Sequence, residues 1–131
     1  RYDYIIDAID TVSSKLDLIE TAHARGIPIL SAMGTGNKID PTKLCITDLS
    51  KTINCSLARV MRKELRERGI KHLRVVYSPE LPAKPEALEA PPPGRRSVPA
   101  SLVWVPGCAG LMMAGEVILT LAGYEKEKSE S

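Results

Sequence analysis

Phenylalanine is absent from the 131-residue sequence, and aromatic residues make up only 4% of it. Aliphatic side chains, alanine and methionine must therefore fill the hydrophobic core. The three cysteines, Cys45, Cys55 and Cys108, stand far apart and form no CxxC pair. An odd, scattered set argues against a disulfide scaffold and a zinc site, and it favours a reducing compartment such as the cytoplasm.

The two common glycine-rich nucleotide motifs are missing as well. Neither a Walker phosphate loop nor a GxGxxG fingerprint occurs, which makes a dinucleotide-dependent oxidoreductase the weakest hypothesis. No membrane span is expected, because the most apolar stretch, residues 100–122, is broken by Pro106, several glycines and Glu116. The formal net charge of +2 does not indicate a nucleic-acid partner by itself, although a local basic patch can still bind one.

The pattern that remains alternates strands with helices. Residues 2–9 have the composition of a buried strand. Asp10 or Thr11 then supplies the N-cap of a helix whose apolar residues recur at helical spacing. Gly26 is a natural helix stop, and residues 27–32 form the next strand. This order predicts a parallel βαβ unit.

The rest of the chain extends the pattern into one α/β domain over residues 1–124. The further expected elements are strands at residues 43–48, 73–77 and 101–105, a helix from Ser56 to Gly69, and a helix at residues 108–122. The last helix is apolar nearly all round, so we expect it to be buried on more than one side and to take part in a homodimer interface. The proline-rich segment 79–99 is expected to be a mobile surface loop, and the charged tail 125–131 is expected to fray.

Ligands of such sheets bind beyond the C-terminal ends of the strands. Asp10 falls at this edge, where a carboxylate can hold Mg²⁺ bound to phosphates; the alternative is a simple helix cap. We interpret Asp7 as structural, with its carboxylate accepting hydrogen bonds from backbone amides. The loop Gly34–Lys38 follows the next strand, and Lys38 either pairs with a phosphate or belongs to an ordinary turn.

The helix that begins near Ser56 carries a second group of candidate residues. Cys55 precedes this helix among basic neighbours, which favours a reactive thiol, and a structural role is the alternative. One face of the helix is basic and is a candidate RNA surface, with an ordinary solvated face as the alternative. The candidate RNA contacts, including two from the proline-rich segment, are Arg59, Arg62, Lys63, Arg66, Arg95 and Arg96.

Several segments together resemble the second half of the ThiF/MoeB/HesA superfamily, the relatives of ubiquitin-activating enzymes. These segments are Tyr4–Lys15, Pro28–Pro41, Asp48–Ile53, Leu57–Leu65, Val75–Ser78 and Pro106–Glu116. Their combination is similar to the branch of tRNA threonylcarbamoyladenosine dehydratases. The resemblance covers nearly the whole chain and is weakest in the proline-rich segment. It implies the C-terminal half of a Rossmann-like fold, with a mixed sheet and flanking helices.

The resemblance also implies a reaction. ATP adenylates the carboxylate of the threonyl group on an adenosine beside the anticodon, a nitrogen of the same modification attacks the activated carbonyl, AMP leaves, and a cyclic hydantoin forms. Asp10 matches the family's acidic residue near the phosphates and Mg²⁺, and Lys15 matches a basic residue in the following helix. The glycine-rich nucleotide loop of the relatives lies upstream of this sequence, so these residues do not complete the adenine and ribose site.

Two other functions remain open. One is an adenylating activator of a ubiquitin-like sulfur-carrier protein, with a sulfur-transfer partner, for which an apolar groove is expected instead of a basic surface. The other is a dimerisation fragment without catalysis. Because the sequence starts at Arg1, without an initiator Met and directly before a core strand, we interpret it as a fragment or a processed piece. Without the upstream nucleotide loop, we expect this piece to be inactive by itself.

Overall fold

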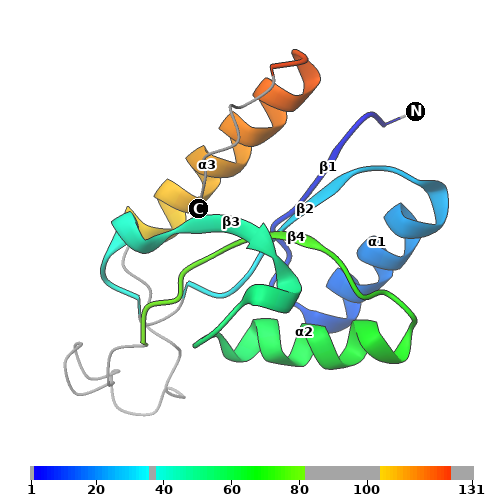
Figure 1. The fold of residues 1–131 in the computed structure, drawn as a ribbon, viewed down its shortest axis with the longest axis horizontal. Helices are drawn as coiled ribbons and strands as arrows, with labels where there is room; N and C mark the ends of the chain where they lie inside the picture. Colours follow the sequence, from blue (N-terminus) through cyan, green and yellow to red (C-terminus); the bar gives the residue numbers. More distant parts are fainter. Residues whose placement is uncertain (1, 36–37, 82–103, 125–131) are drawn as a thin grey trace, which may run out of the picture.

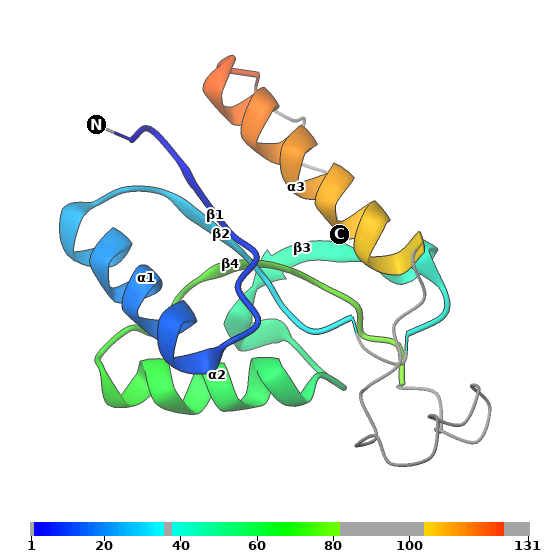
Figure 2. The ribbon, with the colours of Figure 1, turned by 180° about the vertical axis from the view of Figure 1, so that it is seen from behind.

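The computed structural model describes residues 2–35, 38–81 and 104–124 (Figures 1 and 2). Its strands are β1 (Ile5–Asp7), β2 (Ile29–Ala32), β3 (Cys45–Asp48) and β4 (Arg74–Tyr77). Its α-helices are α1 (Val12–Arg25), α2 (Ser56–Glu67) and α3 (Trp104–Leu121), and two short 3-10 helices are η1 (Pro41–Lys43) and η2 (Leu49–Lys51). The four strands lie inside the ranges that the sequence predicts.

The strands form a mixed sheet in the order β1-β2-β4-β3. The pairs β1–β2 and β2–β4 are parallel, which confirms the expected parallel unit, while β3 runs antiparallel to β4. The C-terminal ends of β1, β2 and β4 therefore share one edge, which we call the upper edge. Asp48, at the end of β3, pairs with Arg74 at the start of β4 and so lies at the opposite, lower edge.

Helices cover both faces of the sheet, as expected for this α/β class. α1 and α2 pack on one face and α3 packs on the other (Figure 1). The neighbouring residues Val75 and Val76 of β4 belong to different layers, because successive strand residues point to opposite faces. The first layer is formed mainly by Leu16, Ile19, Met61, Leu65 and Tyr77 around Val75; the second is formed by Val105, Ala109, Met113 and Leu30 around Val76.

The helix ends follow from local chemistry, with one correction. Gly26 ends α1 in the left-handed conformation at φ 66°, and its N–H reaches the carbonyls of the last turn, as predicted. The N-cap of α2 is Cys55 and not Ser56, because the Cys55 thiol accepts a hydrogen bond from the N–H of Ala58 at 3.4 Å. This contact gives Cys55 a structural role at the start of the helix.

α3 differs from the sequence-based expectation at both its start and its surface. It begins at Trp104, so Trp104 and Val105 belong to a helix and not to the expected strand 101–105. Proline is tolerated in the first turn of a helix, which explains why Pro106 does not delay the start. Within a single chain α3 is buried on one side only, since Leu111 is 75% exposed and Ile118 is 64% exposed.

The buried side of α3 is tied to the sheet by an ion pair. Nε and Nη2 of Arg74 both donate to Oε1 of Glu116, at 3.0 and 2.5 Å. Among the described residues, no helix is long and apolar enough to cross a membrane. The expected mobile loop at 79–99 falls mostly outside the described residues, which continue only to Leu81, and the tail 125–131 lies outside them entirely.

Candidate functional site

Asp10 lies at the upper edge of the sheet, in the short connection between β1 and α1. Its side chain is exposed, and no described residue donates a hydrogen bond to it or forms an ion pair with it. Of the two expected caps, Asp10 and Thr11, the N-cap of α1 is Thr11, and it makes no side-chain cap bond. The structure thus presents the Asp10 carboxylate to solvent at the edge where ligands of parallel sheets bind.

Directly beneath Asp10 lies a buried cluster of Asp7, Lys15 and Ser31. Nζ of Lys15 is 2.8 Å from Oδ2 of Asp7, and both side chains are fully buried. The hydroxyl of Ser31, on β2, donates to the same carboxylate oxygen at 2.5 Å. Every hydrogen-bonding group in the cluster has a partner, as buried charges require.

The cluster also holds the backbone that carries Asp10. The N–H of Ile9 donates to Oδ1 of Asp7 at 2.9 Å, and the ammonium of Lys15 donates to the carbonyl of Ile9 at 3.2 Å. Both polar groups of Ile9, the residue before Asp10, are therefore fixed by buried charges. The interpretation of Asp7 as a structural acceptor of backbone hydrogen bonds is confirmed.

The geometry of Lys15 differs from the expected contact with a cofactor. Its ammonium lies inside the protein, between Asp7 and Ile9, and is not exposed at the edge. A signal for this arrangement was present in the sequence. Lys15 follows Val12 by three residues and precedes Ile19 by four, so it lies on the apolar face of α1. A lysine at such a position requires a buried carboxylate, and Asp7 supplies it.

We predict that Lys15→Met lowers the free energy of unfolding by about 3–5 kcal/mol, because it leaves the Asp7 carboxylate buried without its cation. Denaturant titration of the full-length protein measures this loss. The double variant Asp7→Asn/Lys15→Met removes both charges and should lose less. The matched control is Lys43→Met, which removes an exposed lysine and should change stability by less than about 0.5 kcal/mol. Equal losses in the Lys15 and Lys43 variants would contradict the assignment.

At the upper edge of the sheet, Lys38 connects its own loop to the segments that contain Asn54 and Ser78. Its side chain is 2% exposed, and Nζ donates to the carbonyls of Asn54 at 2.9 Å and Ser78 at 3.1 Å, and also to that of Glu80. Asn54 adopts a left-handed conformation, φ 56°, which asparagine tolerates better than most residues. Burial lowers the pKa of Lys38, and electrostatic interactions with Cys55 and Glu80 offset only part of this effect.

The side chain of Glu80 adds hydrogen bonds to the segment that contains Lys38. Its carboxylate accepts hydrogen bonds from the N–H groups of Ile39 and Asp40, at 2.9 to 3.0 Å. The segment after β2 is thereby fixed to the segment after β4. All three ammonium donors of Lys38 are used by backbone carbonyls, so its geometry differs from the expected contact with a phosphate and gives it a structural role.

We predict that Lys38→Met destabilises the protein by about 2 kcal/mol, because buried carbonyls lose a charged donor. The affinity of the folded variant for ATP should stay close to that of the wild type. Thermal unfolding and an ATP titration below the unfolding temperature measure the two effects separately. A lysine that binds phosphate would give the reverse result, with unchanged stability and weaker ATP binding.

The predicted basic face of α2 is present, but its members differ in their surroundings. Arg59, Lys63 and Arg66 are exposed. Arg62 is partly buried, and its Nη1 donates to the carbonyl of Thr52 at 2.9 Å and to the Thr52 hydroxyl. Arg62 therefore supports the turn before α2 in addition to any ligand contact. The other two candidates, Arg95 and Arg96, lie outside the described residues.

A metal ion at this edge would rely on Asp10 and the ligand together. Within residues 2–35, 38–81 and 104–124, no group of three or more His, Cys, Asp or Glu side chains has the geometry to hold a metal. Mg²⁺ commonly binds through one or two carboxylates plus substrate phosphates. The single exposed carboxylate of Asp10 fits that type of site, which the substrate would complete.

A comparison with protein-family models matches residues 1–131 to the ThiF family. The chain belongs to the ThiF family. Among its curated relatives, tRNA threonylcarbamoyladenosine dehydratase of Bacillus subtilis is 40% identical over 128 residues, which cover 91% of this chain and 50% of the relative. Dehydratase 2 of Saccharomyces cerevisiae is 45% identical over 92 residues, which cover 70% of this chain and 21% of the relative. The chain thus spans half or less of these ThiF relatives.

Solved structures support the same placement. A crystal structure of Escherichia coli tRNA N6-threonylcarbamoyladenosine dehydratase superposes with a TM-score of 0.75 at 29% identity, covering 95% of this chain and 52% of that one. A structure of the same enzyme in complex with ATP gives a TM-score of 0.60 at 31% identity, covering 90% and 51%. The predicted fold, half of a ThiF-type α/β domain with a mixed sheet and flanking helices, is confirmed.

Proposed function

We propose that this chain is the C-terminal part of an ATP-dependent tRNA threonylcarbamoyladenosine dehydratase. The observation that carries the proposal is the exposed Asp10 carboxylate, held on a buried ionic support at the ligand-binding edge. The support comes from Asp7 and Lys15, which fix both polar groups of Ile9. The names of the relatives, and the ATP complex of the Escherichia coli enzyme, support the choice of reaction.

In this proposal the carboxylate of the modified adenosine attacks the α-phosphorus of ATP, and pyrophosphate leaves. A nitrogen of the modification then attacks the acyl carbon, the ring closes, and AMP leaves. Bound Mg²⁺ would offset charge that develops on the phosphates. Asp10 would hold that ion against the phosphates, and its fixed backbone means that little reorganisation is needed when charge develops.

We predict that Asp10→Asn in the full-length protein reduces Mg²⁺-dependent AMP formation on threonylcarbamoyl-modified tRNA by about 10²–10³-fold. Its melting temperature should stay unchanged because the side chain is exposed. The matched control is Asp17→Asn, an exposed position on α1. Wild-type turnover in the Asp10 variant would contradict the role of Asp10. Release of AMP by the wild type with a sulfur-carrier protein, and not with modified tRNA, would contradict the dehydratase function.

We also propose a cytoplasmic homodimer whose contact includes the uncovered side of α3. Leu111, Ile118 and Leu121 are 58–75% exposed, and with the exposed Ala114 they recur at spacings of three, four and three residues. Such a stripe is typical of helices that pack against another helix. A sulfur-transfer partner would be a further contact of the same protein.

We predict that Ile118→Lys shifts the full-length protein from dimer to monomer, because a charge replaces an apolar side chain in the contact. The control Thr120→Lys places the same charge at a neighbouring exposed polar position and should leave the dimer intact. Light scattering at micromolar concentration measures the mass of each variant. A monomeric wild type would contradict the proposal.

A further inference from the structure

A basic pocket lies at the lower edge of the sheet, away from Asp10. Its volume is about 230 Å³, and its floor is formed by the buried side chains of Leu49 and Ile70. Its polar walls come from η2, from α2 and from the connection between α2 and β4. The wall residues are Ser50, Arg62, Arg66, Lys71 and His72. We call this cavity the lower pocket.

The lower pocket carries an excess of positive charge. Arg66 and Lys71 are exposed, and neither forms an ion pair with another described residue. Arg62 is held in place by its bonds to Thr52, which keep its charge at the pocket wall. Among the residues that the structure describes, no acidic side chain lines the pocket. Such a cavity favours an anion, and arginine and lysine side chains suit a phosphate group.

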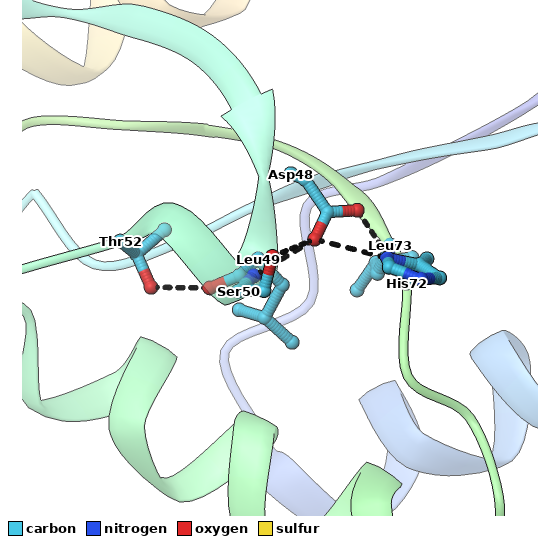
Figure 3. Close-up of polar contacts among 6 residues, drawn as sticks. All are labelled: Asp48, Leu49, Ser50, Thr52, His72 and Leu73. Atoms are coloured by element: carbon cyan, nitrogen blue, oxygen red, sulfur yellow. Dashed lines mark hydrogen bonds and ion pairs between the residues drawn. The ribbon is translucent and has the colours of Figure 1, made fainter.

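The Asp48 carboxylate contacts two residues of the pocket lining, Ser50 and His72. It accepts hydrogen bonds from the N–H and hydroxyl of Ser50, at 2.9 and 2.5 Å, and from the N–H of Leu73 at 3.2 Å (Figure 3). Nδ1 of His72 lies 3.4 Å from the same carboxylate, so the second ring nitrogen remains for a ligand. Burial raises the pKa of Asp48, but the hydrogen bonds from Ser50, His72 and Leu73 outweigh it and hold that pKa below its ordinary value.

Helix α2 runs from the upper edge of the sheet to the lower pocket. Its start is fixed at the upper edge, where Asn54 bonds to Lys38 and to Pro79. The helix is 12 residues long, about 18 Å at 1.5 Å per residue. The exposed cations Arg59, Lys63 and Arg66 succeed one another by about one turn along it, and Arg66 is at the pocket.

We propose that the lower pocket binds a backbone phosphate of the RNA substrate. The exposed cations of α2 would contact the RNA between this pocket and the upper edge. A phosphodiester chain offers one negative charge at each repeat, which matches a row of cations ending in a basic cavity. A free phosphate would use the cavity alone and would leave the row unexplained. This inference rests on the proposed function, because that function supplies the RNA.

The test is the salt dependence of tRNA binding by the full-length protein. Arg66→Ala and Lys71→Ala, made separately, should each weaken binding and reduce the slope of log affinity against log salt by about 0.7–0.9 per lost phosphate contact. Arg25→Ala is the matched control, since it removes an exposed cation on α1 and should leave the slope unchanged. Both pocket side chains are exposed, so thermal unfolding should confirm that all variants remain folded.

Two outcomes would contradict the proposal that the lower pocket binds an RNA phosphate. One is an unchanged slope in both variants. The other is binding of inorganic phosphate that depends on Arg66 and Lys71 while tRNA binding does not. AMP formation by the wild type is measured beside the slopes, so the two proposals fail separately. Unchanged slopes with normal AMP formation refute only the phosphate-binding role of the lower pocket. Reduced slopes in both variants with no AMP formation by the wild type refute only the dehydratase function.

Discussion

The buried ion pair between Asp7 and Lys15 is the contact on which the candidate site depends. Burying two charges costs desolvation energy, and a pair of this kind often contributes little net stability. Its geometry here explains what it does contribute. The pair joins β1, α1 and, through Ser31, β2, and it fixes the polar groups of Ile9 directly before Asp10. An exposed carboxylate on a short connection is thereby given a defined position without losing its access to solvent.

A second buried lysine does the same for the loops beside it. Lys38 donates to three carbonyls in two segments, one at Asn54 and one at Ser78 and Glu80. The Glu80 carboxylate accepts two further hydrogen bonds from Ile39 and Asp40, directly after Lys38. The two buried lysines therefore bind the protein's own backbone, whereas Arg59, Lys63 and Arg66 of α2 face solvent. The difference follows from burial and not from residue type: the buried lysines stabilise the loops, and the exposed cations remain accessible from solvent.

Local patterns predicted much of the fold. The apolar spacing of α1, its stop at Gly26 and the β-rich segments gave the parallel unit, because each signal involves residues close in sequence. The contacts of Lys38 could not be predicted because its partners are distant in sequence; Glu80, for example, is 42 residues away. The burial of Lys15 was indicated by its place on the apolar face of α1, but the pattern did not show that Asp7, at the end of β1, is its partner. The start of α3 was missed because Pro106 suits both a break before a helix and its first turn. The lower pocket was invisible because it requires the antiparallel pairing of β3, which brings Asp48 to the start of β4.

The two edges of the sheet are coupled through α2. Its apolar side, with Ala58, Met61 and Leu65, is fully buried against the core, so the helix cannot tilt without disturbing that packing. Its start is held at the upper edge through Asn54, and its last turn presents Arg66 at the lower edge. Any RNA bound along this helix would thus be positioned relative to Asp10 by a rigid element. The packing that stabilises the domain would then also fix the distance between the bound phosphate and the carboxylate of the modified adenosine.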